Sequence, residues 1–437
     1  MESNRLHTAV LVWTNVCRFL LAFVFTFSGF IKGNDPLGTV YKIEDYLEAW
    51  GIIGLVPGEL IYLAAMLMGI VEFTLGIYLL FGIRRRIASS CILILMAVMT
   101  PLTLWLAIAN PIADCGCFGD AVILTNWETF GKNVVLLIAA VFVFKWRKLI
   151  VQLVTAKVDW LVALYSTVFI VLYTFFCMNR LPVFDFRPYH IGADIREGME
   201  IPEGKKPTTY ETTFIYAKNG IEKEFTIDNF PSADSTWVFV DARTHVKEKG
   251  YEPPIHDFSI VSQEDGTDLT HEILDDEGYT FLLISPQLAL ADDSNIDLIN
   301  EVFDYSQEHG YRFLCVTASS DKDIAMWQEN TGAEYPFALM DDITLKTMIR
   351  SNPGLMLLKK GVVINKWSDG ALPDEYQLSE PLESLSIGQL NKKTVTHKVI
   401  EVLSWFVMPL LMFTLCDLAW LNYRNRKKRK QVADESK

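Results

Sequence analysis

The chain has 437 residues, which is enough for two or three domains, and its net charge is −14. Hydrophobic residues make up 51% of it, and the mean hydropathy of +0.22 is high for a water-soluble protein. Residues 181–397 contain 38 acidic and 18 basic residues, whereas the rest contains 15 acidic and 21 basic residues. An acidic domain is poorly suited to nucleic acid, so we expect no nucleic-acid partner.

The hydrophobic residues are grouped in runs long enough to cross a lipid bilayer, which is therefore an expected partner. Six such runs lie near residues 10–31, 60–82, 88–109, 129–146, 158–178 and 398–421. The first run lacks a small-x-small cleavage site, so we interpret it as an uncleaved signal anchor. The expected fold class is an α-helical membrane bundle of six transmembrane helices, followed in the acidic region by a separate soluble domain.

Basic residues predict how the six spans are oriented. They cluster at Arg84–Arg86, between Lys145 and Lys157, and between Arg424 and Lys430. By the positive-inside rule these segments are cytoplasmic, which puts both termini inside and residues 181–397 outside. This arrangement is typical of a multi-pass protein of the bacterial cytoplasmic membrane. The outer loop at 33–58 has the spacing of a short amphipathic helix, with Tyr46 and Trp50 expected at headgroup level.

The segment Asp114-Cys115-Gly116-Cys117-Phe118-Gly119-Asp120 lies in an outer loop just before the fourth span. A bond between cysteines one residue apart closes a small strained ring, and strained disulfides exchange readily. Gly116 gives the backbone the freedom to bring the sulfurs together. The carboxylates of Asp114 and Asp120 should raise the thiol pKa by charge repulsion, which favours a relaying or sensing pair over an attacking one.

Three roles remain open for Cys115 and Cys117. They form a redox pair, a structural disulfide that holds the loop, or a metal site. Metal is the weakest alternative because no histidine lies nearby, so we expect no metal. The outer side of a bacterial membrane permits either disulfide role.

The other cysteines divide by their depth in the membrane. Cys177, at the outer end of the fifth run, is a possible third thiol on the exposed side. Cys315 lies in an apolar stretch that predicts a buried strand, so we expect it to be inert. The remaining three fall in the cytoplasmic halves of their spans and are interpreted as small hydrophobic residues: Cys17, Cys91 and Cys416.

Two ionisable residues, Arg18 and Glu72, lie well inside predicted spans, where unpaired charges are costly. We expect them to form one pair between the first and second spans. The two residues form either a proton- or quinone-linked site or a structural ion pair that fixes the helix register, unless Glu72 is protonated and neutral.

These features together resemble the DoxX/MauE family of four-helix membrane proteins over residues 10–147. The resemblance rests on Arg18, Glu72, the segment Phe27-Ser28-Gly29-Phe30-Ile31-Lys32 and the Cys-Gly-Cys segment. It implies a redox-associated membrane protein, since MauE assists maturation of a disulfide-rich dehydrogenase subunit. Two further spans and a fused soluble domain depart from the short family form, and nothing in the sequence implies methylamine.

Residues 181–250 are expected to form a small β-rich linker, with a hairpin around Asn219-Gly220 and a strand near Trp237–Val240. Residues 251–390 then alternate strands with helices, which predicts a mixed α/β sheet. The expected strands are 279–284, 312–317, 335–340, 355–359 and 362–367, and the expected helices are 296–309, 323–331 and 344–350.

This order resembles the thioredoxin fold in its TlpA-like form, with 253–260 as the entry strand and Pro353 at the place of the family's cis-proline. Where the family has Cys-x-x-Cys after the first central strand, this chain reads Ile284-Ser285-Pro286-Gln287 and has no cysteine. No thiol chemistry is available there. We therefore interpret the domain as a docking module, with Ser285, Pro286 and Pro353 at its contact edge.

Two functions fit these observations. In the first, Cys115 and Cys117 exchange disulfides with an extracytoplasmic protein partner, and a membrane carrier such as a quinone takes part in the electron transfer. In the second, the protein is a non-enzymatic scaffold of an envelope complex with a structural Cys115–Cys117 disulfide. The expected domains are 1–150, 151–180, 181–250, 251–390 and 391–437.

Overall fold

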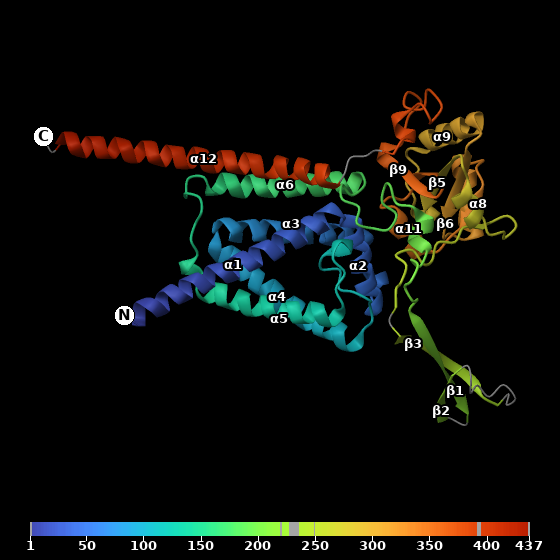
Figure 1. The fold of residues 1–437 in the computed structure, drawn as a ribbon, viewed down its shortest axis with the longest axis horizontal. Coiled ribbons are helices and arrows are strands. Elements are labelled where there is room, and N and C mark those ends of the chain that lie inside the picture. The colour runs from blue at the N-terminus through green and yellow to red at the C-terminus, as the bar shows by residue number, and fades with distance from the viewer. Residues whose placement is uncertain (1, 219–220, 227–235, 249, 391–394, 436–437) are drawn as a thin grey trace.

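A computed structural model describes residues 2–218, 221–226, 236–248, 250–390 and 395–435 of the chain. It consists of a long helical bundle and an α/β domain at one end of the bundle (Figure 1). Both chain termini lie toward the end of the bundle away from the α/β domain. A small sheet projects from the α/β domain and completes the molecule.

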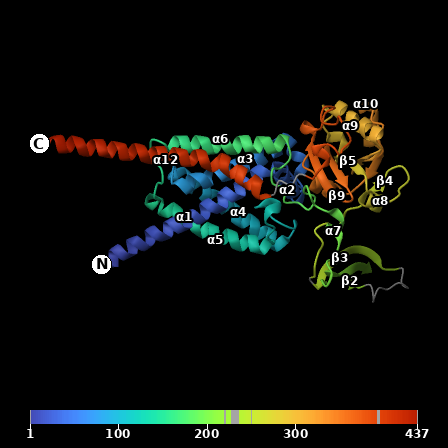
Figure 2. The ribbon, with the colours of Figure 1, turned by 45° about the horizontal axis from the view of Figure 1, so that its top comes forward.

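The described residues contain six helices long and apolar enough to cross a membrane, as predicted. They are α1 (Glu2–Asn34), α3 (Gly58–Phe81), α4 (Arg85–Ala109), α5 (Asn126–Lys145), α6 (Asp159–Asn179) and α12 (Val395–Glu435). Helices α1, α3, α4 and α5 pack together, while α6 lies against α1 and α3 and α12 lies beside α6 (Figure 2). The chain is therefore a multi-pass membrane protein.

Helices α1 and α3 approach each other closely because glycines lie at their contact. A Cβ at Gly29 would be 2.2 Å from the backbone nitrogen of Phe73, and one at Gly76 would be 2.5 Å from that of Thr26. Small residues allow this kind of backbone approach in a bilayer. The contact places the C-terminal half of α1 against the middle of α3, where Lys32 and Glu72 meet.

The α/β domain is built on one mixed sheet whose strand order is β4-β7-β6-β5-β8-β9. Strands β5, β6 and β7 run parallel, and β8 and β9 add to β5 as an antiparallel hairpin. The strands are β4 (Val261–Ser262), β5 (Tyr279–Ser285), β6 (Arg312–Thr317), β7 (Phe337–Leu339), β8 (Gly354–Lys359) and β9 (Val362–Ser368). This order confirms the predicted thioredoxin-like fold.

Helices cover both faces of this sheet. Residues of α9 and α10 pack in one apolar core and residues of α7, α8 and α11 in the other. Their bounds are α7 (Ile195–Met199), α8 (Thr270–Asp275), α9 (Ile296–His309), α10 (Asp321–Thr331) and α11 (Asp342–Met348). The Asn352–Pro353 peptide bond is cis, as the family resemblance implies. The predicted entry strand at 253–260 is wrong: only β4 pairs there, because Pro253 and Pro254 offer no backbone donor.

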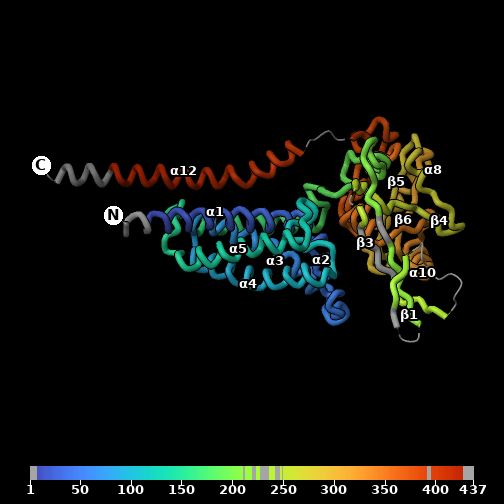
Figure 3. Tube along the Cα trace, turned by 60° about the horizontal axis from the view of Figure 1, so that its bottom comes forward, coloured from blue at the N-terminus to red at the C-terminus, as the bar shows by residue number. Residues whose placement is uncertain are grey.

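The small sheet has the order β2-β1-β3 and extends away from the bundle (Figure 3). Its strands are β1 (Thr209–Lys218), β2 (Ile221–Phe225) and β3 (Val238–Glu248). The pairing of Lys218 with Ile221 confirms the predicted hairpin, and its turn residues Asn219 and Gly220 lie outside the described residues.

Candidate functional site

The Cys-Gly-Cys loop, residues 114–120, is held between two well-defined helix ends. Helix α4 ends at Asn110, which adopts a left-handed conformation (φ 46°). Helix α5 begins with a capping box, in which Thr125 and Glu128 satisfy each other's backbone donors. The loop therefore has a fixed entry and a fixed exit.

The two thiols of this loop are adjacent. The Sγ atoms of Cys115 and Cys117 lie 2.8 Å apart, and both cysteines are free. Gly116 between them has φ +67°, and a Cβ there would meet Cγ of Lys42 at 2.6 Å. Any other residue at position 116 would thus be strained and crowded at once. Cys115 is 6% exposed and Cys117 is partly buried.

Helix α2 (Pro36–Ala49) covers the loop. The Tyr46 hydroxyl donates to the Cys115 carbonyl oxygen at 3.2 Å, and Lys42 Nζ lies 3.3 Å from Asp114 Oδ2. The Tyr46 hydroxyl therefore has a partner within the protein, and its expected position at headgroup level stays a prediction. Trp50, just after the helix, is 48% exposed.

The surroundings give the two cysteines different acidities. A hydrogen bond from Cys115 lowers the pKa of Cys117 to about 6, against the opposing effect of burial, and the charges of Lys132 and Lys32 lower it further. The same hydrogen bond, together with burial, raises the pKa of Cys115. At neutral pH the pair therefore consists of a Cys117 thiolate and a protonated Cys115.

The sequence argument against a reactive thiolate is wrong for a clear reason. The carboxylates of the loop are neutralised by basic partners from other elements. Asp114 pairs with Lys42, and Asp120 lies 3.1 Å from Arg350 of the α/β domain. Lys132 of α5 also acts on Cys117 through its charge, and its Nζ lies 4.2 Å from the centre of the Phe118 ring.

The charge inside the second span has a different partner from the one predicted. Glu72 binds Lys32, whose Nζ lies 2.7 Å from both carboxylate oxygens. Ser28 Oγ lies 2.7 Å from Glu72 Oε2, 3.1 Å from Lys32 Nζ and 2.7 Å from the Cys117 carbonyl oxygen. A buried ion pair is thus linked to the backbone of the thiol loop through a single hydroxyl.

Arg18 does not reach Glu72, so the predicted pair is wrong. Its guanidinium is fully buried and donates to the carbonyl oxygens of Leu79 (2.7 Å), Leu80 (2.5 Å) and Val151 (2.6 Å). Glu72 lies seven residues before Leu79, about 10 Å along the helix, which is too far for one pair. Arg18 satisfies the C-terminal carbonyl groups of α3.

A cavity of about 240 Å³ lies beside the thiols. Residues from α1, α2, α3, α4, the thiol loop and the α/β domain line it. Cys115, Cys117, Lys32, Lys42 and Arg350 supply polar groups. The C-terminal half of α2 and the facing parts of α3 and α4 supply an apolar wall: Ile43, Leu47, Trp50, Met68, Met99 and Leu102.

Arg350, just after α11, joins the α/β domain to the membrane region. Its Nε lies 2.9 Å from Asp35 Oδ2 and its Nη2 lies 3.1 Å from Asp120 Oδ2. The guanidinium also lies 5.3 Å from the centre of the Tyr41 ring, and it is 9% exposed. The edge of the domain that carries the cis-proline is therefore held over the thiol loop by this Arg350 clasp.

The three predicted docking residues, Ser285, Pro286 and Pro353, are buried. Ser285 Oγ donates to Asn352 Oδ1 at 2.7 Å, which fixes the turn before Pro353. They shape this edge of the domain from within, and their role in docking stays a prediction. The exposed residues beside them are Gln287, Ala289 and Leu290.

The structure does not bring Cys177 into the cavity. It is 2% exposed at the C-terminal end of α6 and is absent from the cavity lining. Cys315 is fully buried in β6, as predicted, and burial raises its pKa. Cys17 and Cys91 pack against the bundle core, while Cys416 is exposed on α12.

Sequence reasoning missed the basic residues of the site: Lys32, Lys42, Lys132 and Arg350. Lys32 stands in the segment Phe27–Lys32, directly after the first predicted span, and only the structure shows that α1 continues past it to Asn34. The other three become site residues only through packing between helices or domains, for which the sequence carried no local signal.

Comparison with known proteins agrees with this division of the chain. Residues 8–145 match the family model of methylamine utilisation protein MauE, and residues 210–249 match a domain of unknown function (DUF8463). No curated protein matches the chain. The solution structure of a candidate protein disulfide isomerase from Bacteroides thetaiotaomicron is similar to part of the chain, with 14% sequence identity and a TM-score of 0.23. The match covers 28% of this chain and 80% of that protein. The membrane region is thus similar to the MauE family over residues 8–145, and a thioredoxin-like domain without Cys-x-x-Cys follows it.

Proposed function

We propose that Cys115 and Cys117 form the redox pair of a membrane protein that introduces disulfides into extracytoplasmic proteins. The observation that carries this proposal is the placement of the pair: the two Sγ atoms lie 2.8 Å apart beside the cavity, and the hydrogen bond from Cys115 lowers the pKa of Cys117 to about 6. A structural disulfide that only holds a loop does not require a cysteine of low pKa.

The electron balance of the proposed reaction is as follows. A substrate thiolate attacks the Cys115–Cys117 disulfide, a mixed disulfide forms, and Cys117 leaves because the sulfur of lower pKa leaves faster. The second substrate thiolate breaks the mixed disulfide. The substrate loses two electrons and two protons. One proton remains on Cys115, the other is released, and Cys117 remains as the thiolate.

The reduced pair needs an electron acceptor, and we propose a membrane quinone. The cavity supports this choice because it joins an apolar wall, which suits an isoprenoid quinone ring, to basic groups beside the thiols. A quinone bound there would accept two electrons, the proton of Cys115 and one further proton. Lys32 and Lys42 would stabilise negative charge on its oxygens, and Leu102 and Trp50 would contact its ring.

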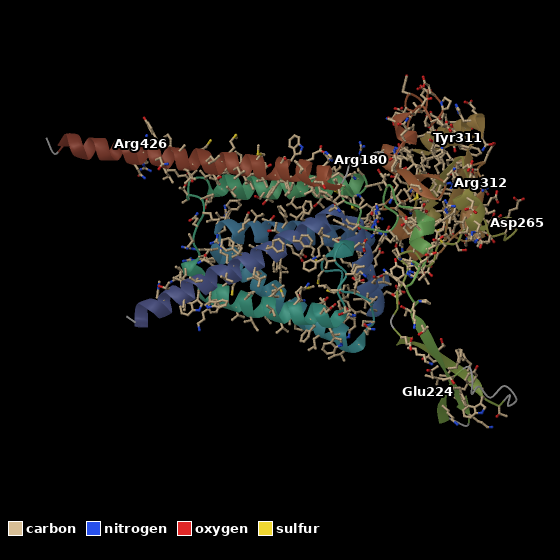
Figure 4. All side chains as sticks on the ribbon, viewed as in Figure 1. Arg180, Glu224, Asp265, Tyr311, Arg312 and Arg426 are labelled. Atoms are coloured by element: carbon tan, nitrogen blue, oxygen red, sulfur yellow. The ribbon has the colours of Figure 1, made fainter. Side chains whose placement is uncertain are left out.

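The proposed orientation puts the thiols and the α/β domain outside the bacterial cytoplasmic membrane, with both termini in the cytoplasm. Its support is that the basic segments meet at one end of the bundle. Arg85 donates to the Ile150 carbonyl at 3.1 Å, and Asp417 of α12 accepts from Thr155 at 3.0 Å. Arg426 lies at this same end, far from Arg180 at the junction with the α/β domain (Figure 4).

The proposal predicts how each thiol reacts with iodoacetamide in the full-length protein in detergent. The rate at Cys117 should be half-maximal near pH 6, because the thiolate forms as the pH rises through its pKa and is lost below it. Cys115 should stay unmodified over the same range. Mass spectrometry of the separate cysteine peptides measures both rates.

Cys115→Ala is the matched variant for this measurement. It removes the hydrogen bond that stabilises the thiolate, so the half-point at Cys117 should rise toward the ordinary cysteine value of about 8.5. Cys416→Ala, on α12, should leave the half-point unchanged. A pair that is isolated as a disulfide and resists a mild reductant would instead support the scaffold function.

The quinone step has its own prediction. Leu102→Trp should fill the cavity and slow reoxidation of the reduced pair by menadione at least about tenfold, since overpacking excludes the ring. Oxidation of the same pair by glutathione disulfide should be little changed. Ile108→Trp, at a 71% exposed position on the same helix, is the control. Equal menadione rates in all three proteins would rule out this cavity as the quinone site.

A further inference from the structure

The Lys32–Glu72 ion pair lies inside the membrane region, yet the proposed reaction assigns it no role. Lys32 is 5% exposed and Glu72 is 13% exposed. Burying two charges is costly, and a hydrophobic pair of similar size would often be at least as stable. Stability alone is therefore a weak explanation for this pair, and its surroundings give a better one.

The geometry ties the pair to one cysteine of the loop. Lys32 contacts Ser28 Oγ at 3.1 Å, and the same oxygen lies 2.7 Å from the Cys117 carbonyl. Lys32 also lines the cavity together with both thiols. The ammonium group is thus held within two hydrogen bonds of the Cys117 backbone, on the side of the loop that faces α1.

The two charges of the pair act on Cys117 with opposite sign. In this low-dielectric setting, the positive charge of Lys32 favours the thiolate and the negative charge of Glu72 disfavours it. The groups that face Cys117 come from five elements: Cys115 in the loop, Lys132 on α5, Lys32 on α1, Glu72 on α3 and Tyr46 on α2. Among them, only Lys32 and Glu72 are joined to each other by an ion pair.

We propose that Lys32 and Glu72 are positioning residues of the redox site, which together set the charge on Cys117 and so select it over Cys115 as the sulfur that leaves and attacks. Lys32 stabilises the Cys117 thiolate that leaves when the mixed disulfide forms on Cys115. Glu72 holds Lys32 in place and limits its effect, so that the thiolate stays a good enough nucleophile to re-form the disulfide. This inference rests on the proposed redox function.

The test is the pH profile of Cys117 alkylation by iodoacetamide in full-length variants. Lys32→Met should raise the half-point by about one pH unit, and Glu72→Gln should lower it by about one unit. At a pH one unit below the wild-type half-point, the two variants should therefore differ in rate by more than about tenfold. Lys32→Arg keeps the charge and should restore the wild-type half-point.

Opposite shifts are the diagnostic result. If the ion pair only held α1 against α3, both variants would loosen the same contact and would change Cys117 reactivity in the same direction. Shifts of equal sign, or no shift in either variant, would overturn the inference. The double variant K32M/E72Q avoids an unpaired charge. If Lys32→Met alone fails to fold, the half-point of the double variant should still lie above that of Glu72→Gln, because the double variant lacks the positive charge of Lys32.

This result is separate from the test of the redox function itself. A wild-type half-point near 8.5 would count against the redox proposal whatever the variants did. A wild-type half-point near 6, with no opposite shifts, would leave the redox proposal standing and remove only the role of Lys32 and Glu72.

Discussion

Replacement of Arg350 with alanine is expected to loosen the α/β domain from the membrane region and to expose the thiol loop. Arg350 is the cation between two carboxylates, Asp35 and Asp120, which are 17% and 44% exposed. Its removal leaves like charges facing each other across the domain contact. Truncating one member of a buried ion pair costs several kcal/mol, and about 3 kcal/mol is expected here because Asp120 is half exposed.

The measurement is the iodoacetamide reaction of Cys117 at pH 8, where the thiolate is fully formed in both proteins. Arg350→Ala should react about tenfold faster, or more, because the clasp no longer closes one side of the cavity. Lys360→Ala, an exposed position in the same domain that pairs with Glu277, is the control and should match the wild type. An unchanged rate in Arg350→Ala would mean that the clasp does not limit access to the thiols.

The second large effect is expected at the opposite end of the bundle. Arg18→Leu should destabilise the membrane region by about 3 kcal/mol or more, because three carbonyl groups lose their donor at once. The apolar replacement adds no partner for them. The C-terminal turn of α3 and the segment at Val151 should then separate from α1.

Unfolding of the purified protein in increasing dodecyl sulfate, followed by circular dichroism, measures this change. Arg86→Leu is the control, because Arg86 is exposed at the start of α4 and its loss should cost less than about 0.5 kcal/mol. Arg18→Lys keeps a charge but has fewer donors, so it should fall between the two. Equal stability of Arg18→Leu and wild type would show that the carbonyl groups find other partners.

The fold was largely predictable because its signals are local. Six apolar runs of membrane length gave the six spans, and the alternation of apolar strands with amphipathic helices gave the sheet. The helix Ile296–His309 and the strand Arg312–Thr317 have the predicted ends, since Gly310 terminates the helix in a left-handed conformation. Strand β4 was not predicted, because a strand of two residues is too short to show an alternating hydrophobic pattern.

The site was only partly predictable because its chemistry comes from contacts between elements. The motif identified Cys115 and Cys117, but their acidity depends on Lys132 and Lys32 from two different helices. Which residue pairs with Glu72 depends on the register of α1 against α3. Glycines at the contact between the two helices set this register, and the hydropathy of the sequence does not reveal it. Arg350 lies more than 200 residues from the loop that it contacts, and only the packed domains bring it there.

The chain runs from α6 into the α/β domain and from the domain back to α12, and α6 and α12 lie side by side. The domain is therefore tethered to the membrane at two neighbouring points, which permits rocking but not release into solution. If the Arg350 contact opens, the domain stays tethered near the thiol loop. Its effective concentration there remains high, in the range that is typical of short intramolecular linkages. On the proposed function, a substrate protein would have to compete with this domain for the thiols, so weak encounters would be rejected while a tightly binding partner would gain entry.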